Sequence, residues 1–184
     1  MFKQENFRLD GAKAIVTGAG AGIGRAIAET FAGAGAAVAV TDLDAAAAES
    51  VAEGIVAAGG RAFGAACNVT KEEDLEGAVD RAVSEFDGLT ILVNNAGGGG
   101  PKPFDMPMTD MHWAFELNVF SVFRLCQLAA PNMARAGGGS ILNITSMAAE
   151  NRNRRMASYA SSKAAESHLT RTICLLYTSP SPRD

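Results

Sequence analysis

The stretch KAIVTGAGAGIGRAIAETFAGAGAAVAVTD, residues 13–42, decides the fold. It consists of a short apolar run, a glycine-rich turn, an alanine-rich helical stretch from about Gly22 to Ala34, and a second apolar run that leads to Asp42. Glycine tolerates a positive φ, and the absence of side chains lets backbone amides approach a phosphate at the helix N-terminus. The pattern predicts a nucleotide-binding βαβ unit, with an ordinary structural turn, a flavin site and a methyltransferase site as alternatives.

The same unit recurs along the chain, because short apolar runs alternate with longer stretches of helical spacing. Asp44 is expected to cap the second helix, and Thr70 with Glu73 to form a capping box for the third. One long helix is expected from about Thr109 to Ala136, and a last one from near Ser158. We expect five strands, at 13–17, 37–41, about 62–67, 89–94 and in a run that ends near 145. These elements predict an α/β, Rossmann-type, doubly wound parallel sheet with strand order 3-2-1-4-5, whose ligands lie beyond the carboxyl ends of the strands.

The composition fits one soluble domain, since 48% of the 184 residues are hydrophobic and 20% are charged. A net charge of -4 without a run of Lys or Arg disfavours nucleic acid and anionic membranes as partners. The first residues, MFKQENFRLDG, carry charges where a signal peptide needs an apolar core. Cys67, Cys126 and Cys174 are odd in number and lack metal-ligand spacing, so we expect reduced thiols, no metal and a cytoplasmic location.

The last residues, CLLYTSPSPRD at 174–184, break the pattern of the chain. Pro180 and Pro182 prevent a helix from continuing there. The stretch resembles the in-frame translation of a sequencing-library adaptor, and a genuine proline-rich terminus is the alternative. We therefore expect a domain of residues 1–173 that is incomplete at its C-terminal end, followed by a non-native tail at 174–184.

Asp42 is the candidate for nucleotide selection. It ends the second strand 18 positions after Gly24, close to the spacing at which an acidic residue meets the adenosine ribose. A carboxylate there accepts hydrogen bonds from the ribose hydroxyls and repels a 2′-phosphate, and neither Ala19 nor Leu43 supplies a cation for such a phosphate. NAD is therefore expected in preference to NADP, with a purely helix-capping Asp42 as the alternative.

Four motifs follow one another along the chain: TGAGAGIG at 17–24, NNAG at 94–97, Ser146, and YASSK at 159–163. Together they resemble the short-chain dehydrogenase/reductase family over nearly all of residues 9–172. The resemblance implies an NAD-dependent oxidoreductase that acts on the CH–OH group of a secondary alcohol. It also places Asn68 beside the adenine ring; the family usually has Asp there, so we expect the Asn68 carbonyl oxygen to give a weaker or altered adenine contact. The cofactor-binding residues are then expected to be Gly18, Gly22, Ile23, Gly24, Asp42, Leu43, Asn68, Val69, Asn95, Ala96, Gly97, Tyr159 and Lys163.

The predicted catalytic group is Ser146, Asn118, Tyr159 and Lys163. Tyr159 and Lys163 are four residues apart on one helix face. Taken alone, this spacing is typical of ordinary surface residues. A phenol with the ordinary pKa near 10 is a poor base at neutral pH. By the resemblance, the Lys163 ammonium and the charged nicotinamide favour the phenolate, and Tyr159 is the general acid/base. The resemblance gives Ser146 a hydrogen bond to the substrate oxygen and Asn118 a water that links Lys163 to solvent, the alternative for Asn118 being an ordinary helix-interior residue.

The residues around the expected active-site mouth, at 97–108, 116–121 and 144–153, resemble those bacterial hydroxysteroid dehydrogenases of the family that act at the 7α position. The resemblance implies reversible oxidation of the 7α-hydroxyl of a bile acid, with Ser146, Asn151 and Tyr159 as substrate contacts and Met147, Ala148 and Ala149 as apolar walls. Another secondary-alcohol dehydrogenase, a 3-ketoacyl reductase and a non-catalytic NAD-binding regulatory module are the alternatives. A regulatory module would need none of the four predicted catalytic residues. The presence of all four therefore argues against that alternative.

The resemblance also implies a homo-oligomer, a tetramer, and further strands and a substrate lid beyond residue 173. Without them the fifth strand, ILNIT, is expected to form a bare apolar edge. We therefore expect the 184-residue chain by itself to bind NAD poorly and to be inactive.

Overall fold

The computed structural model describes residues 7–177, and their side chains as far as residue 174. The last described helix, α6 (Ala157–Tyr177), continues past residue 173. Residues 178–184, the greater part of the expected tail, lie outside the described residues, so the predicted boundary at residue 173 stays a prediction.

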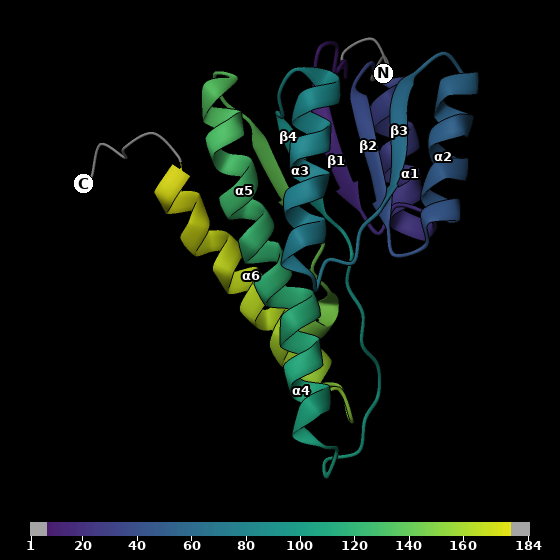
Figure 1. Cartoon of the computed structure of the whole chain (residues 1–184). Helices are drawn as coiled ribbons and strands as arrows, with labels where there is room; N and C mark the ends of the chain where they lie inside the picture. The colour runs from purple at the N-terminus through teal and green to yellow at the C-terminus, as the bar shows by residue number, and fades with distance from the viewer. Residues whose placement is uncertain (1–6, 178–184) are drawn as a thin grey trace, which may run out of the picture. The chain divides into compact units, whose positions relative to one another are not determined.

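Within the described residues, five strands form one sheet in the order β3-β2-β1-β4-β5 (Figure 1). The strands β1 and β2, β1 and β4, and β2 and β3 pair in parallel. Most residues of β1, β2 and β4 are buried, which is typical of parallel strands covered by helices on both faces. The strand bounds are β1 Lys13–Thr17, β2 Ala37–Asp42, β3 Arg61–Ala66, β4 Ile91–Asn94 and β5 Ser140–Asn143. The predicted fold class and strand order are confirmed.

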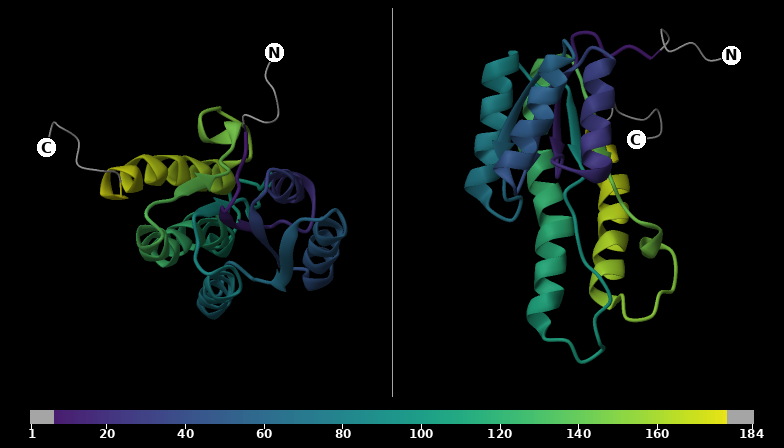
Figure 2. Two further views of the ribbon diagram at one scale, coloured as in Figure 1. Left: turned by 90° about the horizontal axis from the view of Figure 1, so that it is seen from above. Right: turned by 90° about the vertical axis from the view of Figure 1, so that its right-hand side faces the viewer.

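Helices cover both faces of this sheet. Two of them, α1 (Gly22–Gly33) and α2 (Ala45–Ala57), lie on one face, while α3 (Glu72–Phe86) and the part of α5 (Ser121–Arg135) from Arg124 onward lie on the other (Figure 2). Arg124 of α5 forms ion pairs with Glu72 and Glu76 of α3 at 2.7 and 2.9 Å. Asp44 caps α2 as predicted, because its carboxylate accepts a hydrogen bond from the Ala47 amide at 3.2 Å.

The described chain divides into two compact units. The first holds residues 7–96 and 124–142, which include the strands β1 to β4 and the helices α1 to α3. Its core includes the fully buried side chains of Ile15, Val16, Val38, Leu92 and Val93. The second unit holds residues 97–123 and 143–177, with α4 (Met108–Phe115), the π-helical segment η2 (Glu116–Phe120), the 3-10 turn η3 (Met147–Ala149) and α6. Each unit carries one group of predicted site residues.

The predicted capping box of α3 is wrong. The N-cap residue is Lys71, and no side chain caps the helix. The hydroxyl of Thr70 instead donates to the Asn68 side-chain oxygen at 2.8 Å, and the Thr70 amide donates to the same oxygen at 3.1 Å. This Asx turn uses the Thr70 hydroxyl before the helix begins, so Glu73 has no partner for a reciprocal cap.

Two predicted boundaries also differ from the structure. The single long helix expected at 109–136 is α4, η2 and α5 in succession, with a π-helical segment between the two α-helices. Such π segments within α-helices frequently occur at functional sites. The fifth strand ends at Asn143 rather than near Thr145. The carbonyl oxygen of the next residue, Ile144, accepts a hydrogen bond from the Lys163 ammonium.

Candidate functional site

The first unit carries the glycine-rich turn at the carboxyl end of β1. Gly18 and Gly22 have φ values of +60° and +56°, a region in which only glycine is free of strain. A Cβ atom on Gly24 would lie against the Gly18 carbonyl oxygen and 2.5 Å from the Asn95 side-chain nitrogen, so α1 packs directly on the turn. The first turn of α1 contains no acidic residue, and the positive end of its dipole can therefore receive an anion such as a phosphate.

Asn95 fastens the glycine-rich turn to the end of β4. Its side-chain nitrogen donates to the carbonyl oxygens of Thr17 and Gly18, both at 2.9 Å. The Thr17 hydroxyl oxygen accepts from the amides of Asn95 and Ala96 at 3.1 and 3.0 Å. The structure thus brings Asn95 and Ala96 to the turn. Their expected contact with the adenine-ribose side of a cofactor stays a prediction.

Asp42 lies next to the same turn. One carboxylate oxygen accepts from the Gly20 amide at 2.9 Å and the other from the Asp44 amide at 3.0 Å. A carboxylate offers about four acceptor positions, so about two remain for ligand hydroxyls. Ile23 and Leu43 are 64% and 74% exposed in the same unit.

Asn68 and Val69 lie between β3 and α3. Val69 is buried, and Asn68 is half-buried. Both lone pairs of the Asn68 side-chain oxygen are used by the hydrogen bonds from Thr70. In this conformation the oxygen has no further acceptor position for an adenine amino group. The predicted adenine contact therefore requires an exchange of these bonds, and it stays a prediction.

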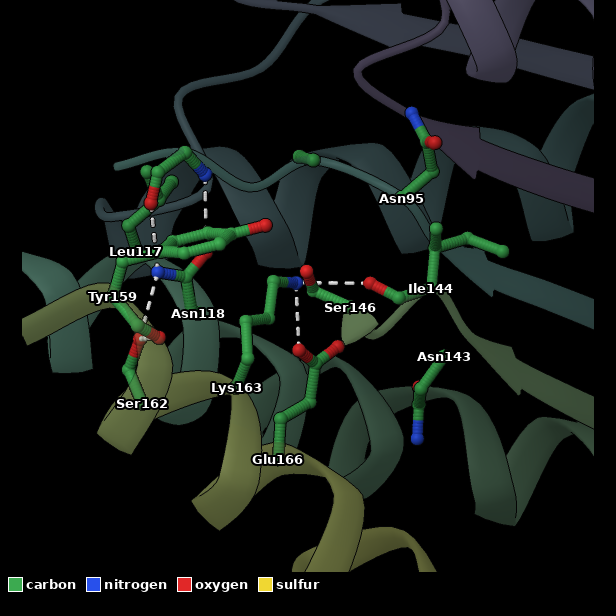
Figure 3. A network of polar contacts seen from close by, with 12 residues as sticks. Asn95, Leu117, Asn118, Asn143, Ile144, Ser146, Tyr159, Ser162, Lys163 and Glu166 are labelled. Atoms are coloured by element: carbon green, nitrogen blue, oxygen red, sulfur yellow. Dashed lines mark hydrogen bonds and ion pairs between the residues drawn. The ribbon is translucent and has the colours of Figure 1, made fainter. Parts of the chain in front are cut away.

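The second unit carries Asn118 within the π-helical segment η2. Its side chain is fully buried. Its nitrogen donates to the Gly98 carbonyl oxygen at 2.9 Å and to the Ser162 hydroxyl at 3.0 Å, and its oxygen accepts from the Gly98 amide at 3.0 Å (Figure 3). Asn118 therefore ties the loop that follows β4 to α6. Its predicted role in holding a water stays a prediction.

Ser146, Tyr159 and Lys163 all belong to the second unit, and Figure 3 shows their side chains in one group. Tyr159 is half-buried, and the backbone of Gly99 packs on its ring, since a Cβ atom on Gly99 would lie 2.5 Å from the ring. The Ser146 oxygen accepts from the Ala148 amide at 3.1 Å, which leaves its O–H able to donate. In the part of the chain that the structure describes, no hydrogen bond joins these three side chains directly. Their catalytic roles stay predictions.

Glu166 is a residue of this group that the sequence reasoning missed. The Lys163 ammonium donates to the Glu166 carboxylate at 2.6 Å and to the Ile144 carbonyl oxygen at 2.9 Å. The side chains of Lys163 and Glu166 are 4% and 0% exposed. Burial raises the pKa of the Glu166 carboxyl above its usual range, while Lys163 acts in the opposite direction. The i, i+3 spacing of the two charges along one predicted helix is the signal that could have revealed the pair.

Asn151, the remaining predicted substrate contact, lines a cavity of about 280 Å³ in the second unit. Phe104, Lys102 and Arg152 are among the other lining residues. Ser146 and Tyr159 do not line it, so this cavity does not bring Asn151 together with them. Of the predicted apolar walls, Met147 is exposed and Ala148 is buried.

Neither a metal-ligand cluster nor a membrane-spanning helix is present among the described residues. Among residues 7–177, no group of three or more His, Cys, Asp and Glu residues could hold a metal ion. The helices of that range are too short or too polar to cross a membrane. His112 and His168 are exposed. Cys67 and Cys126 are buried, and burial raises the pKa of each thiol to about 11.

Comparison with known proteins gives close matches along most of the chain. The 7alpha-hydroxysteroid dehydrogenase of Escherichia coli is 60% identical over 173 residues, which cover 94% of this chain and 68% of that protein. A 3-oxoacyl-[acyl-carrier-protein] reductase of Staphylococcus epidermidis is 36% identical over 162 residues, which cover 86% of this chain and 66% of the reductase. Among solved structures, a 7α-hydroxysteroid dehydrogenase complexed with NADH and 7-oxo glycochenodeoxycholic acid matches with a TM-score of 0.92 and 59% identity, over 96% of this chain and 69% of that one.

The family comparison agrees with these matches. The model of the family described as short chain dehydrogenase matches residues 12–179. The match covers the glycine-rich turn, the Asn94–Gly97 segment, Ser146 and the α6 residues on which the resemblance depends. The chain therefore belongs to the short-chain dehydrogenase family.

Proposed function

We propose that the protein transfers a hydride between NAD and a secondary alcohol or its ketone, and that its substrate is the 7α-hydroxyl of a bile acid. The observation that carries the proposal is the 60% identity to the Escherichia coli 7alpha-hydroxysteroid dehydrogenase over 94% of this chain. The similar solved structure holds both NADH and a 7-oxo bile acid. The 3-oxoacyl reductase, at 36% identity, is the weaker match.

The first unit fits the adenosine and pyrophosphate parts of NAD. The turn keeps side chains away from the N-terminus of α1, because Gly18 and Gly22 adopt positive φ and Gly24 has no room for a Cβ atom. Asp42 would accept hydrogen bonds from the ribose hydroxyls through its remaining acceptor positions, and it would repel a 2′-phosphate. Further cofactor contacts are proposed for Ile23, Leu43, Asn68, Val69, Asn95, Ala96, Gly97, Tyr159 and Lys163. NAD, when bound, supplies the hydride acceptor.

The second unit supplies the groups that move the proton. In alcohol oxidation the substrate hydroxyl gives its proton to the Tyr159 oxygen, and in ketone reduction Tyr159 returns it to the carbonyl oxygen. Ser146 donates a hydrogen bond to the same substrate oxygen through its free O–H. Lys163 contributes a positive charge that favours the deprotonated phenol. Asn118 fixes the loop before α4 on α6 and holds the water of the proton path.

The remaining proposals concern specificity, assembly and location. Asn151 contacts the steroid at a polar position. We propose a homo-oligomer, a tetramer, because the second unit exposes Met108, Trp113, Phe120 and Phe123 by 41% to 65%.

A cytoplasmic location fits the buried Cys67 and Cys126, neither of which forms a disulfide. Sedimentation velocity and cell fractionation test these two statements.

The function is tested by an activity panel with the protein expressed from its own complete gene. NADH formation is followed with bile acids hydroxylated at positions 3, 7α, 7β or 12, and with either dinucleotide. The proposal expects turnover of the 7α-hydroxylated acids with NAD, and at least tenfold lower kcat/KM with NADP. A preference for 3-hydroxyacyl thioesters would favour the reductase alternative, and cofactor binding without any turnover would favour a regulatory module.

A further inference from the structure

Glu166 is a buried carboxylate to which the proposed reaction gives no task. It lies one turn beyond Lys163 on α6 and is 0% exposed. One of its oxygens accepts from the Lys163 ammonium at 2.6 Å, while the other is buried without a hydrogen-bond partner among the described residues. A buried carboxylate with one of its two oxygens unpartnered is costly. Its presence therefore requires an explanation through its one charged partner.

The ammonium of Lys163 is held on several sides. Two of its three N–H donors are used, one by Glu166 and one by the Ile144 carbonyl oxygen at 2.9 Å. The backbone of Gly97 closes a further side, because a Cβ atom there would lie 3.1 Å from the ammonium nitrogen. One donor remains for another partner. Glu166 and Ile144 thus fix the position of the nitrogen before any ligand binds.

A carboxylate at this distance also reduces the positive potential that the lysine presents to its surroundings. Charges in contact interact strongly where water is excluded. Tyr159 lies one turn before Lys163 on the same face of α6. The field of Lys163 at the Tyr159 oxygen is therefore the field of an ion pair rather than that of an isolated cation.

We propose that Glu166 is a positioning residue for Lys163: it holds the ammonium against the Ile144 carbonyl oxygen, and it sets the pH range of the reaction by offsetting part of the lysine charge. The inference rests on the proposed function, since Lys163 matters here through its effect on Tyr159. Burial is the largest cause of the raised pKa of Glu166, and Lys163, the one charged group that acts on this carboxyl, opposes the rise.

Other ionisable residues of the neighbouring elements do not share this role. The elements packed against α6 are η3, α4 and η2. Their ionisable side chains in the described chain are Asp110, His112 and Glu116, and Glu150 follows η3. None of the four contributes to the shift of the Glu166 carboxyl. A change in pH dependence on replacement of Glu166 is therefore attributable to the Lys163–Glu166 pair.

The first test is the pH profile of kcat/KM in Glu166→Gln, measured with whichever secondary alcohol of the panel the wild type oxidises. The amide keeps the shape of the side chain and can still accept from the ammonium, but it removes the negative charge. The rising limb of the profile should move to lower pH by about one unit. Glu85→Gln, on the exposed surface of α3, is the control and should keep the wild-type profile. A Glu166→Gln profile that superimposes on the wild type overturns the proposal.

Glu166→Ala tests the positioning role, because the ammonium then loses its strongest anchor. We expect kcat to fall about tenfold while KM changes less than twofold, with the Gln variant recovering part of the loss. Circular dichroism shows whether the variant folds. An unchanged kcat in a folded Ala variant contradicts the proposal.

A measurement without turnover separates this inference from the proposed function. Carbon-13 NMR of the Glu166 carboxyl follows its titration in the wild type and in Lys163→Met. Loss of the cation should move the titration of Glu166 to higher pH, because the group that opposed the effect of burial is gone. Identical titrations would show that the pair does not form and would overturn the inference. The steroid proposal fails independently if the wild type oxidises other alcohols but none of the 7α-hydroxylated acids.

Discussion

The glycine-rich turn of the first unit and the lysine site of the second unit are built from different components. At the turn, the geometry comes from backbone groups and from positions where no side chain fits, such as Gly24. At the lysine site it comes from two opposite charges, Lys163 and Glu166, held out of water. The glycine-rich turn should therefore lose function when side-chain atoms are added, and the lysine site should lose function when a charge is removed.

Lys163→Met should have the largest effect, because it removes the charge that favours the Tyr159 phenolate. We expect kcat for alcohol oxidation to fall about 10³-fold at neutral pH. Lys71→Met, at the exposed N-cap of α3, is the matched control and should retain wild-type kcat. Steady-state NADH formation measures both variants. A kcat of the Lys163→Met enzyme within tenfold of the wild-type value would contradict the claim that the lysine charge controls the reaction.

The same pair should dominate the stability of the second unit. Lys163→Met leaves Glu166 buried without its cation, and such losses cost about 3–5 kcal/mol. The double variant Lys163→Met/Glu166→Leu removes both charges and should recover most of this loss. Urea unfolding gives the free energies of unfolding. If the double variant is as unstable as the single one, packing rather than charge holds this region together.

The stability of the wild type relative to Glu166→Gln should also depend on pH. Burial raises the pKa of the Glu166 carboxyl, so folding favours its protonated form. The stabilisation that results is complete below the ordinary glutamic acid pKa, at about pH 4, and is lost as the pH rises through the raised value. The free energy of unfolding of the wild type should therefore fall relative to that of the Gln variant as the pH increases from about 4. A difference in unfolding free energy that stays constant between pH 4 and 8 would contradict this sign.

Gly24→Val tests the backbone-built site. The new side chain would press on the Gly18 carbonyl oxygen and on Asn95, and overpacking of this kind costs about 1–3 kcal/mol. NAD affinity should fall at least tenfold, because the turn must shift. Gly33→Ala, at the end of α1 where nothing lies within 4 Å of the new Cβ atom, is the control and should bind NAD normally. Isothermal titration calorimetry compares the two variants.

Asp42→Asn should have a smaller effect that is specific to the nucleotide. The amide loses the negative charge that repels a 2′-phosphate, and one of its two polar atoms no longer accepts a hydrogen bond. The ratio of NAD to NADP affinity should fall about tenfold. Asp80→Asn, on the exposed face of α3, should leave the ratio unchanged. An unaltered ratio of NAD to NADP affinity in Asp42→Asn would favour the alternative, in which Asp42 has only a helix-capping role.

The smallest effect concerns the cysteines, which belong to neither site. Burial raises the pKa of the Cys67 and Cys126 thiols to about 11, while Cys174 is exposed. A thiol reagent should therefore modify Cys174 rapidly and the other two only on unfolding. Rapid modification of all three in the native protein would mean that both buried regions open readily.

The parts of the molecule that follow from local patterns were predictable from the sequence. Alternating apolar runs and helical stretches predicted the strand order, and the position of Asp44 predicted the cap of α2. The Asx turn of Asn68 with Thr70, the π-helical segment at 116–120 and the pairing of Lys163 with Glu166 were not predicted. The first two depend on a choice between competing hydrogen bonds. The i, i+3 spacing of Lys163 and Glu166 allows an ion pair, but a helix of mixed polarity does not reveal in its sequence that the pair is buried.

The most direct test of the account compares wild type and Tyr159→Phe, both expressed from the complete gene, with NAD and a 7α-hydroxylated bile acid. The account predicts NADH formation by the wild type and a loss of at least about 10²-fold in the variant, with NAD affinity within threefold of the wild type. Equal turnover in the two proteins, or no turnover of the 7α-hydroxylated acid by a wild type that binds NAD, would contradict it.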